Sequence, residues 1–284
     1  MTDQATTSPV QKLPVARPHP GFSPRRVGAM LLRHLYILRG SWPRLIELAY
    51  WPTMQMLIWG FMTTFLAENS TWVAQAGGVL ISAVLLWDVL FRANLGMSLT
   101  FIEEMWARNL AQLFVSPLRP SELMVTLMIM AAIRTLISVA PAAFMALPLF
   151  GYWVFDLGPP LAAFFANLLI MGWWIGLFVA GIVLRFGLGA ESVCWLGVFL
   201  FAPISGIWYP IAVLPDWLEL VALALPGAHV FEGMRAVLLE SRFDWDHLGA
   251  AVGLNAVYLA AAVGFFLYQL KRARNLGLLL QQGE

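Results

Sequence analysis

Long apolar stretches constrain this chain more than any other feature of its sequence. A helix that crosses a bilayer needs about 20 mostly apolar residues. Hydrophobic residues make up 60% of the 284 residues and charged residues only 12%, unlike the balance of a soluble domain. We therefore predict an all-α integral membrane protein with six transmembrane helices between residues 46 and 270. The six windows are 46–67, 77–99, 122–150, 158–184, 192–214 and 248–270.

The residues before the first window divide into two parts. Residues 1–24 are rich in proline and have no apolar core, so they are predicted to be a disordered cytosolic tail rather than a signal sequence. Residues 25–45 repeat apolar side chains at helical spacing, which is typical of an amphipathic helix in the membrane interface. The predicted apolar face holds Val27, Met30, Leu31, Leu35, Leu38, Trp42 and Leu45, and Arg26, Arg33 and Arg44 lie opposite.

The distribution of lysine and arginine predicts the orientation of the chain. Basic residues prefer cytosolic loops, and here they gather before the first window, around the loop between the second and third, and after the last. The long loop after the fifth window has mostly carboxylates instead. Both termini, including a tail at 271–284, are therefore predicted to be cytosolic. The protein itself is predicted to be integral to the inner (cytoplasmic) membrane. Because the basic residues follow topology and form no single patch, no nucleic-acid partner is expected.

The predicted cytosolic loop of residues 100–121 combines charge, a short apolar run and two prolines. Glu103 and Glu104 favour a helix start by complementing its dipole, and Pro117 and Pro120 prevent the helix from continuing. Two roles are open for this segment: a connector that rests on the membrane surface, or a docking helix for a cytosolic partner. The side chains of interest are Glu103, Glu104, Arg108, Leu110, Leu113, Phe114 and Arg119.

Prolines also interrupt the apolar stretch 202–235. Pro203, Pro210, Pro215 and Pro226 divide it into the end of a span and two short helices. Such helices can enter the outer leaflet only where protein covers their free backbone groups. The alternative is a flat interfacial hairpin anchored by aromatic residues. We favour re-entrant helices within 215–246, before the last span.

Charged residues inside the predicted spans are the usual functional candidates. Asp88 and Arg92 are four residues apart on the second span, and Arg134 lies within the third. A charge inside a span costs about 2.5 to 3.5 kcal/mol on insertion scales, so Asp88 is expected to neutralise one of the two arginines. A structural ion pair is favoured over a substrate or proton site.

Two of these segments resemble the permeases of ABC-2 type transporters. Glu103, Glu104, Leu110 and Leu113, followed by "SPLRPSEL", are similar to the first cytosolic loop of that family. The stretch "APISGIWYPIAVLPDWLELVALALPGAHVFEGMR", residues 202–235, is similar to its pattern at the end of the fifth span. The two motifs occur in the family's order and spacing. One departure is Arg108 with Asn109, where many members have Gly-Thr.

The resemblance implies the transmembrane permease subunit of an ATP-driven ABC exporter, paired with a second permease copy as a homodimer and with two copies of an ABC ATPase. The sequence contains no G-x-x-x-x-G-K-[ST] loop, so ATP and Mg are expected on the ATPase, and no catalytic, cofactor or metal site is expected on this chain. The loop 100–121 would be the coupling helix. The external gate would include Pro203, Ser205, Tyr209, Pro210, Pro215 and Trp217.

Two other classes of function are the alternatives. A secondary transporter driven by ions would need internal repeats and coupling carboxylates near the midplane, and the sequence shows no such repeat. A membrane-embedded transferase would need a reactive constellation in a loop. The nearest candidates, His229 with Glu232 and the stretch 244–247, lack the spacing of a metal site. Glycans, lipid-linked molecules and hydrophobic drugs are all compatible with the family.

Overall fold

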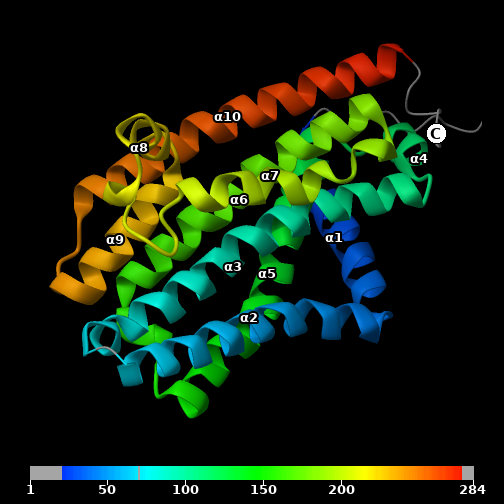
Figure 1. The fold of residues 1–284 in the computed structure, drawn as a ribbon. Helices are drawn as coiled ribbons and strands as arrows, with labels where there is room; N and C mark the ends of the chain where they lie inside the picture. The colour runs from blue at the N-terminus through cyan, green and yellow to red at the C-terminus, as the bar shows by residue number, and fades with distance from the viewer. Residues whose placement is uncertain (1–20, 70, 277–284) are drawn as a thin grey trace, which may run out of the picture.

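The computed structural model describes residues 21–69 and 71–276, and this part of the chain contains helices and no strand. Five long helices form the bundle: α2 (Trp42–Asn69), α3 (Thr71–Trp106), α5 (Pro120–Phe150), α6 (Pro159–Phe186) and α10 (Trp245–Asn275). Helix α3 is central, packed against α2, α5 and α6, whereas α10 lies along the outer edge (Figure 1). The prediction of an all-α membrane protein is confirmed.

The six predicted spans are confirmed only in part. Within the described residues, α5, α6, α10 and the Gly78–Trp106 part of α3 are long and apolar enough to cross a membrane. A fifth crossing is possible if α8 (Asp216–Leu223) and α9 (Pro226–Glu240), which meet at 94°, count as one broken span. Helix α2 has 28 residues but is not in this apolar group. The chain is a multi-pass membrane protein, and by this criterion its described residues contain four or five candidate spans.

The predicted fifth span, 192–214, is not one helix. Helix α7 covers only Val193–Phe201, and the short 3-10 turns η3 (Ala202–Ile204) and η4 (Ile211–Val213) follow it. Pro203 and Pro210 each lack a backbone donor, and Gly206 adopts a left-handed φ of 64° between them. The chain therefore turns where a continuous helix was predicted. The two short helices predicted after this region are present as α8 and α9.

The amphipathic helix predicted at 25–45 is divided in the structure. Helix α1 (Pro24–Arg39) ends at Gly40, and residues from Trp42 onward belong to α2. Its buried side chains, Val27, Met30, His34 and Leu38, lie on one face, next to α5. Trp42, 70% exposed, and Leu45 therefore lie on a different helix from the rest of the predicted apolar face. Residues 1–20 and 277–284, which hold most of the two predicted tails, lie outside the described residues, and α10 extends to Asn275.

Helices α3 and α6 approach each other closely because α6 carries glycines at the contact. A Cβ atom added to Gly172 would lie 2.4 Å from the Cβ of Ala93, and one added to Gly176 would lie 2.5 Å from the Cβ of Met97. Small residues at such positions allow the two backbones to pack side by side. Asn94 of α3 then donates a hydrogen bond of 2.9 Å to the carbonyl of Cys194, which fastens α7 to the same centre.

Candidate functional site

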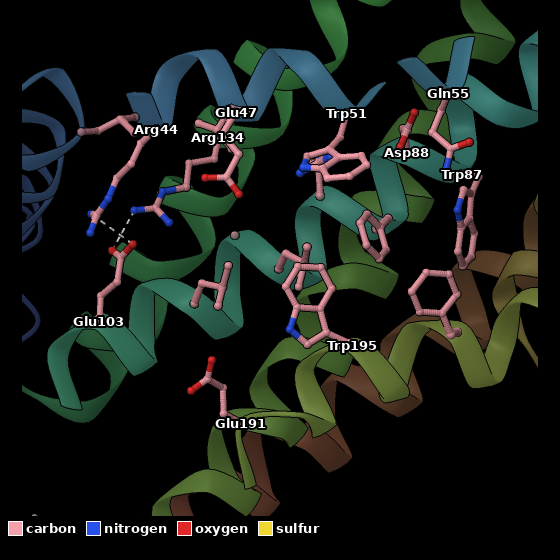
Figure 2. Close-up of a pocket in the computed structure, with 18 of the residues that line it drawn as sticks. Arg44, Glu47, Trp51, Gln55, Trp87, Asp88, Glu103, Arg134, Glu191 and Trp195 are labelled. Carbon is pink, nitrogen blue, oxygen red and sulfur yellow. Dashed lines mark hydrogen bonds and ion pairs between the residues drawn. The ribbon is translucent and has the colours of Figure 1, made fainter. Parts of the chain in front are cut away.

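A cavity of about 570 Å³ lies between α2, α3, α5 and α7 (Figure 2). Along α3 its wall extends from Trp87 to Trp106, roughly 28 Å of helix at 1.5 Å per residue. Aromatic rings and charges of both signs share this wall, which is unusual for the interior of a membrane protein. The aromatic residues are Trp51, Trp87, Phe91, Trp106, Trp195 and Phe199, and the charged ones are Arg44, Glu47, Asp88, Arg92, Glu103, Arg134 and Glu191.

Ion pairs hold one end of the cavity. Arg134 Nη2 of α5 lies 2.9 Å from Glu103 Oε2 of α3, and Arg44 Nη1 of α2 lies 3.3 Å from Glu103 Oε1. Figure 2 shows both arginines reaching toward this single carboxylate. Arg134 was one of the two arginines expected to pair with Asp88, and its partner is Glu103 instead. The carboxylate therefore joins three helices at this end.

Asp88 and Arg92 lie nearer the start of α3 than Glu103 does. Figure 2 shows Asp88 together with Gln55 at the opposite end of the cavity from Glu103. Their side chains line the cavity although Asp88 is only 2% exposed and Arg92 only 7%. Among the described residues, no carboxylate and guanidinium here come within 4.0 Å, and Asp88 Oδ2 and Arg92 Nε have no hydrogen-bond partner. A molecule that offers both a donor and an acceptor would satisfy both atoms.

The predicted coupling loop contains one short helix, α4 (Leu110–Val115). Glu103 and Glu104 do not start it, because α3 continues to Trp106 and both carboxylates lie in its last turns. Their placement there follows from their partners: Arg33 Nη1 of α1 lies 2.5 Å from Glu104 Oε1, and Arg44 and Arg134 hold Glu103. The predicted role of these two residues as a helix start is therefore wrong.

Leu110 and Leu113 of α4 face the bundle more than the surroundings. Leu110 is 2% exposed and packs in the hydrophobic core, and Leu113 is half-buried against it. Leu110 is thus not on an exposed patch, whereas Arg108 is exposed with a left-handed φ of 54°. The N–H of Arg119 donates to Glu122 Oε2 at 2.9 Å. The side chain of Phe114 lies outside the described part.

Glu122, a residue that the sequence did not single out, joins α1 to the start of α5. Arg26 Nε donates to Glu122 Oε2 at 2.9 Å, and the backbone N–H of Ser23 donates to Oε1 at 2.8 Å. The hydrogen bond with this carboxylate raises the pKa of the Arg26 guanidinium above its ordinary value. Together with the Arg33–Glu104 pair, this contact ties α1 to the two helices that flank α4.

The loop between α7 and α8 is held by Arg235 and Glu232 of α9. Arg235, 8% exposed, donates to the carbonyl of Gly206 and, at 2.7 Å, to that of Tyr209. Glu232 pairs with Arg235 at 2.9 Å and accepts a hydrogen bond of 2.8 Å from the N–H of Ile211. The two charges at the end of the second sequence motif therefore fix the backbone of this loop.

The predicted gate residues divide into buried and exposed ones. Ser205 is fully buried and donates to the carbonyl of Phe201 at 2.8 Å. The hydroxyl of Tyr209 donates to the carbonyl of Pro203 at 2.6 Å. Exposed members of the set are Pro203, Pro210, Pro215 and Trp217.

A sequence model of the family described as "ABC-2 type transporter" matches residues 38–239. The chain belongs to this family. A search among curated proteins found no match. The matched range includes every residue that lines the cavity, helix α4 and the loop held by Arg235. This ABC-2 membrane protein is accordingly a transporter permease component, a membrane domain that is not itself catalytic.

Proposed function

We propose that this ABC-2 permease is the membrane-spanning subunit of an ATP-driven exporter that moves its substrate out of the cytoplasm. Family membership supports the transport role. The sequence lacks a G-x-x-x-x-G-K-[ST] loop to hold nucleotide phosphates. In this proposal two copies of a separate ABC ATPase bind ATP and Mg²⁺ and drive the permease.

The observation that carries the proposal is the cavity, together with two buried atoms in its wall, Asp88 Oδ2 and Arg92 Nε, that have no hydrogen-bond partner among the described residues. A buried charge without a partner is costly, and in membrane proteins such groups mark pathways for substrates or ions. A molecule in the cavity would contact Trp87 or Trp195 with its apolar part and exchange hydrogen bonds with Asp88 and Arg92. This geometry favours the functional interpretation of Asp88 over the structural ion pair that the sequence suggested.

A second copy of the chain would complete the cavity. Trp51 of α2 and Trp195 and Phe199 of α7 line it, yet they are 53%, 44% and 55% exposed. Other large apolar side chains on the same helices, such as Ile58 and Leu196, are exposed as well. Exposed apolar side chains of this kind can be buried against another subunit. We therefore propose a homodimer in which each copy supplies half of the pathway.

The end of the bundle that holds α4 is proposed to face the cytosol, with both termini on that side of the inner membrane. There Trp106, Arg108 and Gln112 are exposed, and these residues form the proposed contact with the ATPase. Leu110 would anchor α4 in the core, so that a displacement of α4 by the ATPase would also displace α3. The loop held by Arg235 would act as the external gate.

Transport by the permease and its ATPase in liposomes tests the proposal. Export should stop when the phosphate loop of the ATPase is altered and should continue after an ionophore collapses the proton gradient. Export that follows the ion gradient without ATP would contradict the proposal and support the ion-coupled alternative.

Co-purification tests the contact surface. Trp106→Asp should release the ATPase, because interfaces concentrate their energy in a few large side chains. Trp245, 73% exposed at the start of α10, provides the matched control. Trp245→Asp should retain the ATPase, and equal retention by the two variants would remove Trp106 from the interface.

A further inference from the structure

A second cavity, of about 200 Å³, lies between the C-terminal ends of α6 and α10, apart from the transport cavity. Arg185 of α6 and Gln269 and Arg272 of α10 supply its polar wall. Helix α10 is the least buried of the candidate spans, with 22% of its most apolar window covered by the rest of the chain. Figure 1 shows α10 along the edge of the bundle, the position at which a helix meets the surrounding lipid.

The two arginines bring positive charge to the point where both helices end. Arg185 and Arg272 are exposed, and within the described residues neither has a carboxylate at ion-pair distance. Guanidinium groups bind phosphate oxygens through strong, charge-assisted hydrogen bonds. Basic pockets at the ends of transmembrane helices bind anionic lipid headgroups for this reason.

Gln269 adds a different requirement to the same cavity. Its side chain is 3% exposed, and Oε1 has no hydrogen-bond partner in the described part of the chain. This oxygen is an acceptor, so a phosphodiester oxygen cannot satisfy it, and a ligand must bring a donor. A headgroup with a hydroxyl next to its phosphodiester offers both groups at once.

We propose that this cavity binds the headgroup of phosphatidylglycerol, an anionic phospholipid. The phosphodiester lies between Arg185 and Arg272, and a glycerol hydroxyl donates to Gln269 Oε1. Leu276 lines the cavity at 58% exposure, and Phe186, next to Arg185, is 62% exposed. These two side chains form an apolar border for the acyl chains. Inorganic phosphate would find the same arginines but has no tail to use that border.

Lipid binding to the delipidated, purified permease tests the proposal without any substitution. Three lipids with the same acyl chains are compared by titration and native mass spectrometry: phosphatidylglycerol, phosphatidylmethanol and phosphatidylcholine. Phosphatidylmethanol keeps the single negative charge but lacks the hydroxyl. We expect phosphatidylglycerol to bind about fivefold more tightly than phosphatidylmethanol, the value of one neutral hydrogen bond. Phosphatidylcholine should bind at least about tenfold more weakly than phosphatidylglycerol.

Two variants locate the site. Arg185→Gln with Arg272→Gln should lower the affinity for phosphatidylglycerol at least about tenfold. The matched control removes two other exposed cations, Arg25→Gln with Lys271→Gln, and should leave the affinity unchanged. Gln269→Leu should bind phosphatidylglycerol and phosphatidylmethanol equally.

Three results would overturn the proposal. Equal binding of the two anionic lipids to the unaltered permease would remove Gln269 from headgroup recognition. Equal affinity of the arginine variant and its control would remove the site. Displacement of the lipid by millimolar inorganic phosphate would show that the arginines hold a free anion instead. Because the proposal concerns a bound lipid and is measured by binding, a failure of ATP-driven export would leave it standing.

Discussion

Arg134 of α5 and Glu103 of α3 form an ion pair of 2.9 Å at one end of the cavity between α2, α3, α5 and α7. The Arg134 side chain is only 7% exposed, and Glu103 also lies 3.3 Å from Arg44 of α2. A nearly buried guanidinium depends on its counter-charge, because water cannot replace the lost partner. The pair therefore contributes to the packing of three helices as well as to the charge of the cavity.

Replacing Glu103 with glutamine should lower the free energy of unfolding by about 1–3 kcal/mol, since a nearly buried donor loses its charged acceptor. Thermal unfolding in detergent would measure the change. Glu47 lines the same cavity, is exposed and has no ion pair among the described residues, so Glu47→Gln is the matched control. The double change Glu103→Gln and Arg134→Gln should recover part of the loss. Identical melting of Glu103→Gln and its control would contradict this assignment.

Asp88→Asn should have the opposite pattern: unchanged stability and weaker transport. No described group pairs with Asp88 Oδ2, so its neutralisation breaks no ion pair. A substrate that donates to this carboxylate would lose a charge-assisted hydrogen bond, and its export rate at low concentration should fall about tenfold or more. Asp246→Asn, at an exposed position on α10, is the control. Unaltered export together with a lower melting temperature would instead support a structural role.

The sequence predicts the long apolar helices well because they need only length and hydropathy. Helix α5 ends at Phe150, where its window ends, and α6 covers Pro159–Phe186 against a window of 158–184. The prediction fails for the window 192–214 because a mean hydropathy contains no information on where the backbone can continue as a helix. Pro203 and Gly206 end the helix without adding charge.

The site is less predictable because its contacts join residues that are distant in the sequence. Asp88, Arg92 and Arg134 stand out as charges in apolar stretches, but their partners do not. Glu103 is 31 residues from Arg134, and Glu104 is 71 residues from Arg33. Helical periodicity relates only residues three or four apart. Sequence alone therefore identifies the charges but not the pairing of Arg134 with Glu103.

His34 of α1 should make stability depend on pH. Its side chain is 2% exposed and packs near Glu104 and Arg33. Burial lowers the pKa of His34 below its ordinary value of 6.5, more than the Glu104 carboxylate, 3.6 Å away, raises it. As the pH falls below 6.5, His34 takes up a proton in the unfolded chain before it does so in the folded one, so the folded state loses stability. Above pH 6.5, His34 adds no pH dependence to the free energy of unfolding.

Thermal unfolding between about pH 5 and pH 8 would measure this effect. His34→Gln should flatten the acid side of the profile. His247→Gln, which alters the ring that contacts His229 at 3.1 Å, should leave the contribution of His34 to the profile in place. A steeper loss of stability in acid for His34→Gln than for the unaltered protein would contradict a lowered pKa of His34 in the folded state.

The contact of α3 with α6 should not tolerate a single added methyl group. The new Cβ of Gly172→Ala would lie 2.4 Å from the Cβ of Ala93 and 2.8 Å from the backbone nitrogen of Asn94. Overpacking of this kind costs about 1–3 kcal/mol. Gly253 of α10 has no atom within 4 Å of such a Cβ, so Gly253→Ala should be neutral or stabilising through helix propensity. Melting temperatures that fall equally in both variants would show that the loss of stability comes from replacing a helical glycine, and not from the contact between α3 and α6.

Arg108 combines a strained backbone with an exposed side chain, and the two features can be separated by experiment. Its φ of 54° lies in the left-handed region, which costs a residue with a Cβ about 1–2 kcal/mol. Glycine avoids that cost but loses more conformational entropy on folding. Arg108→Gly should therefore raise stability by about 0.5–1 kcal/mol, whereas Ala107→Gly, at a negative φ, should lower it by a similar amount.

The same variant tests the proposed contact with the ATPase, because Arg108, like Trp106 and Gln112, is exposed. If its guanidinium meets carboxylates on the partner, Arg108→Gly should retain less ATPase during purification although the permease itself melts at a higher temperature. Opposite changes in these two measurements cannot arise from misfolding. A variant that gains stability and keeps the ATPase would place Arg108 outside the contact, and one that loses stability would mean that its left-handed backbone carries no strain.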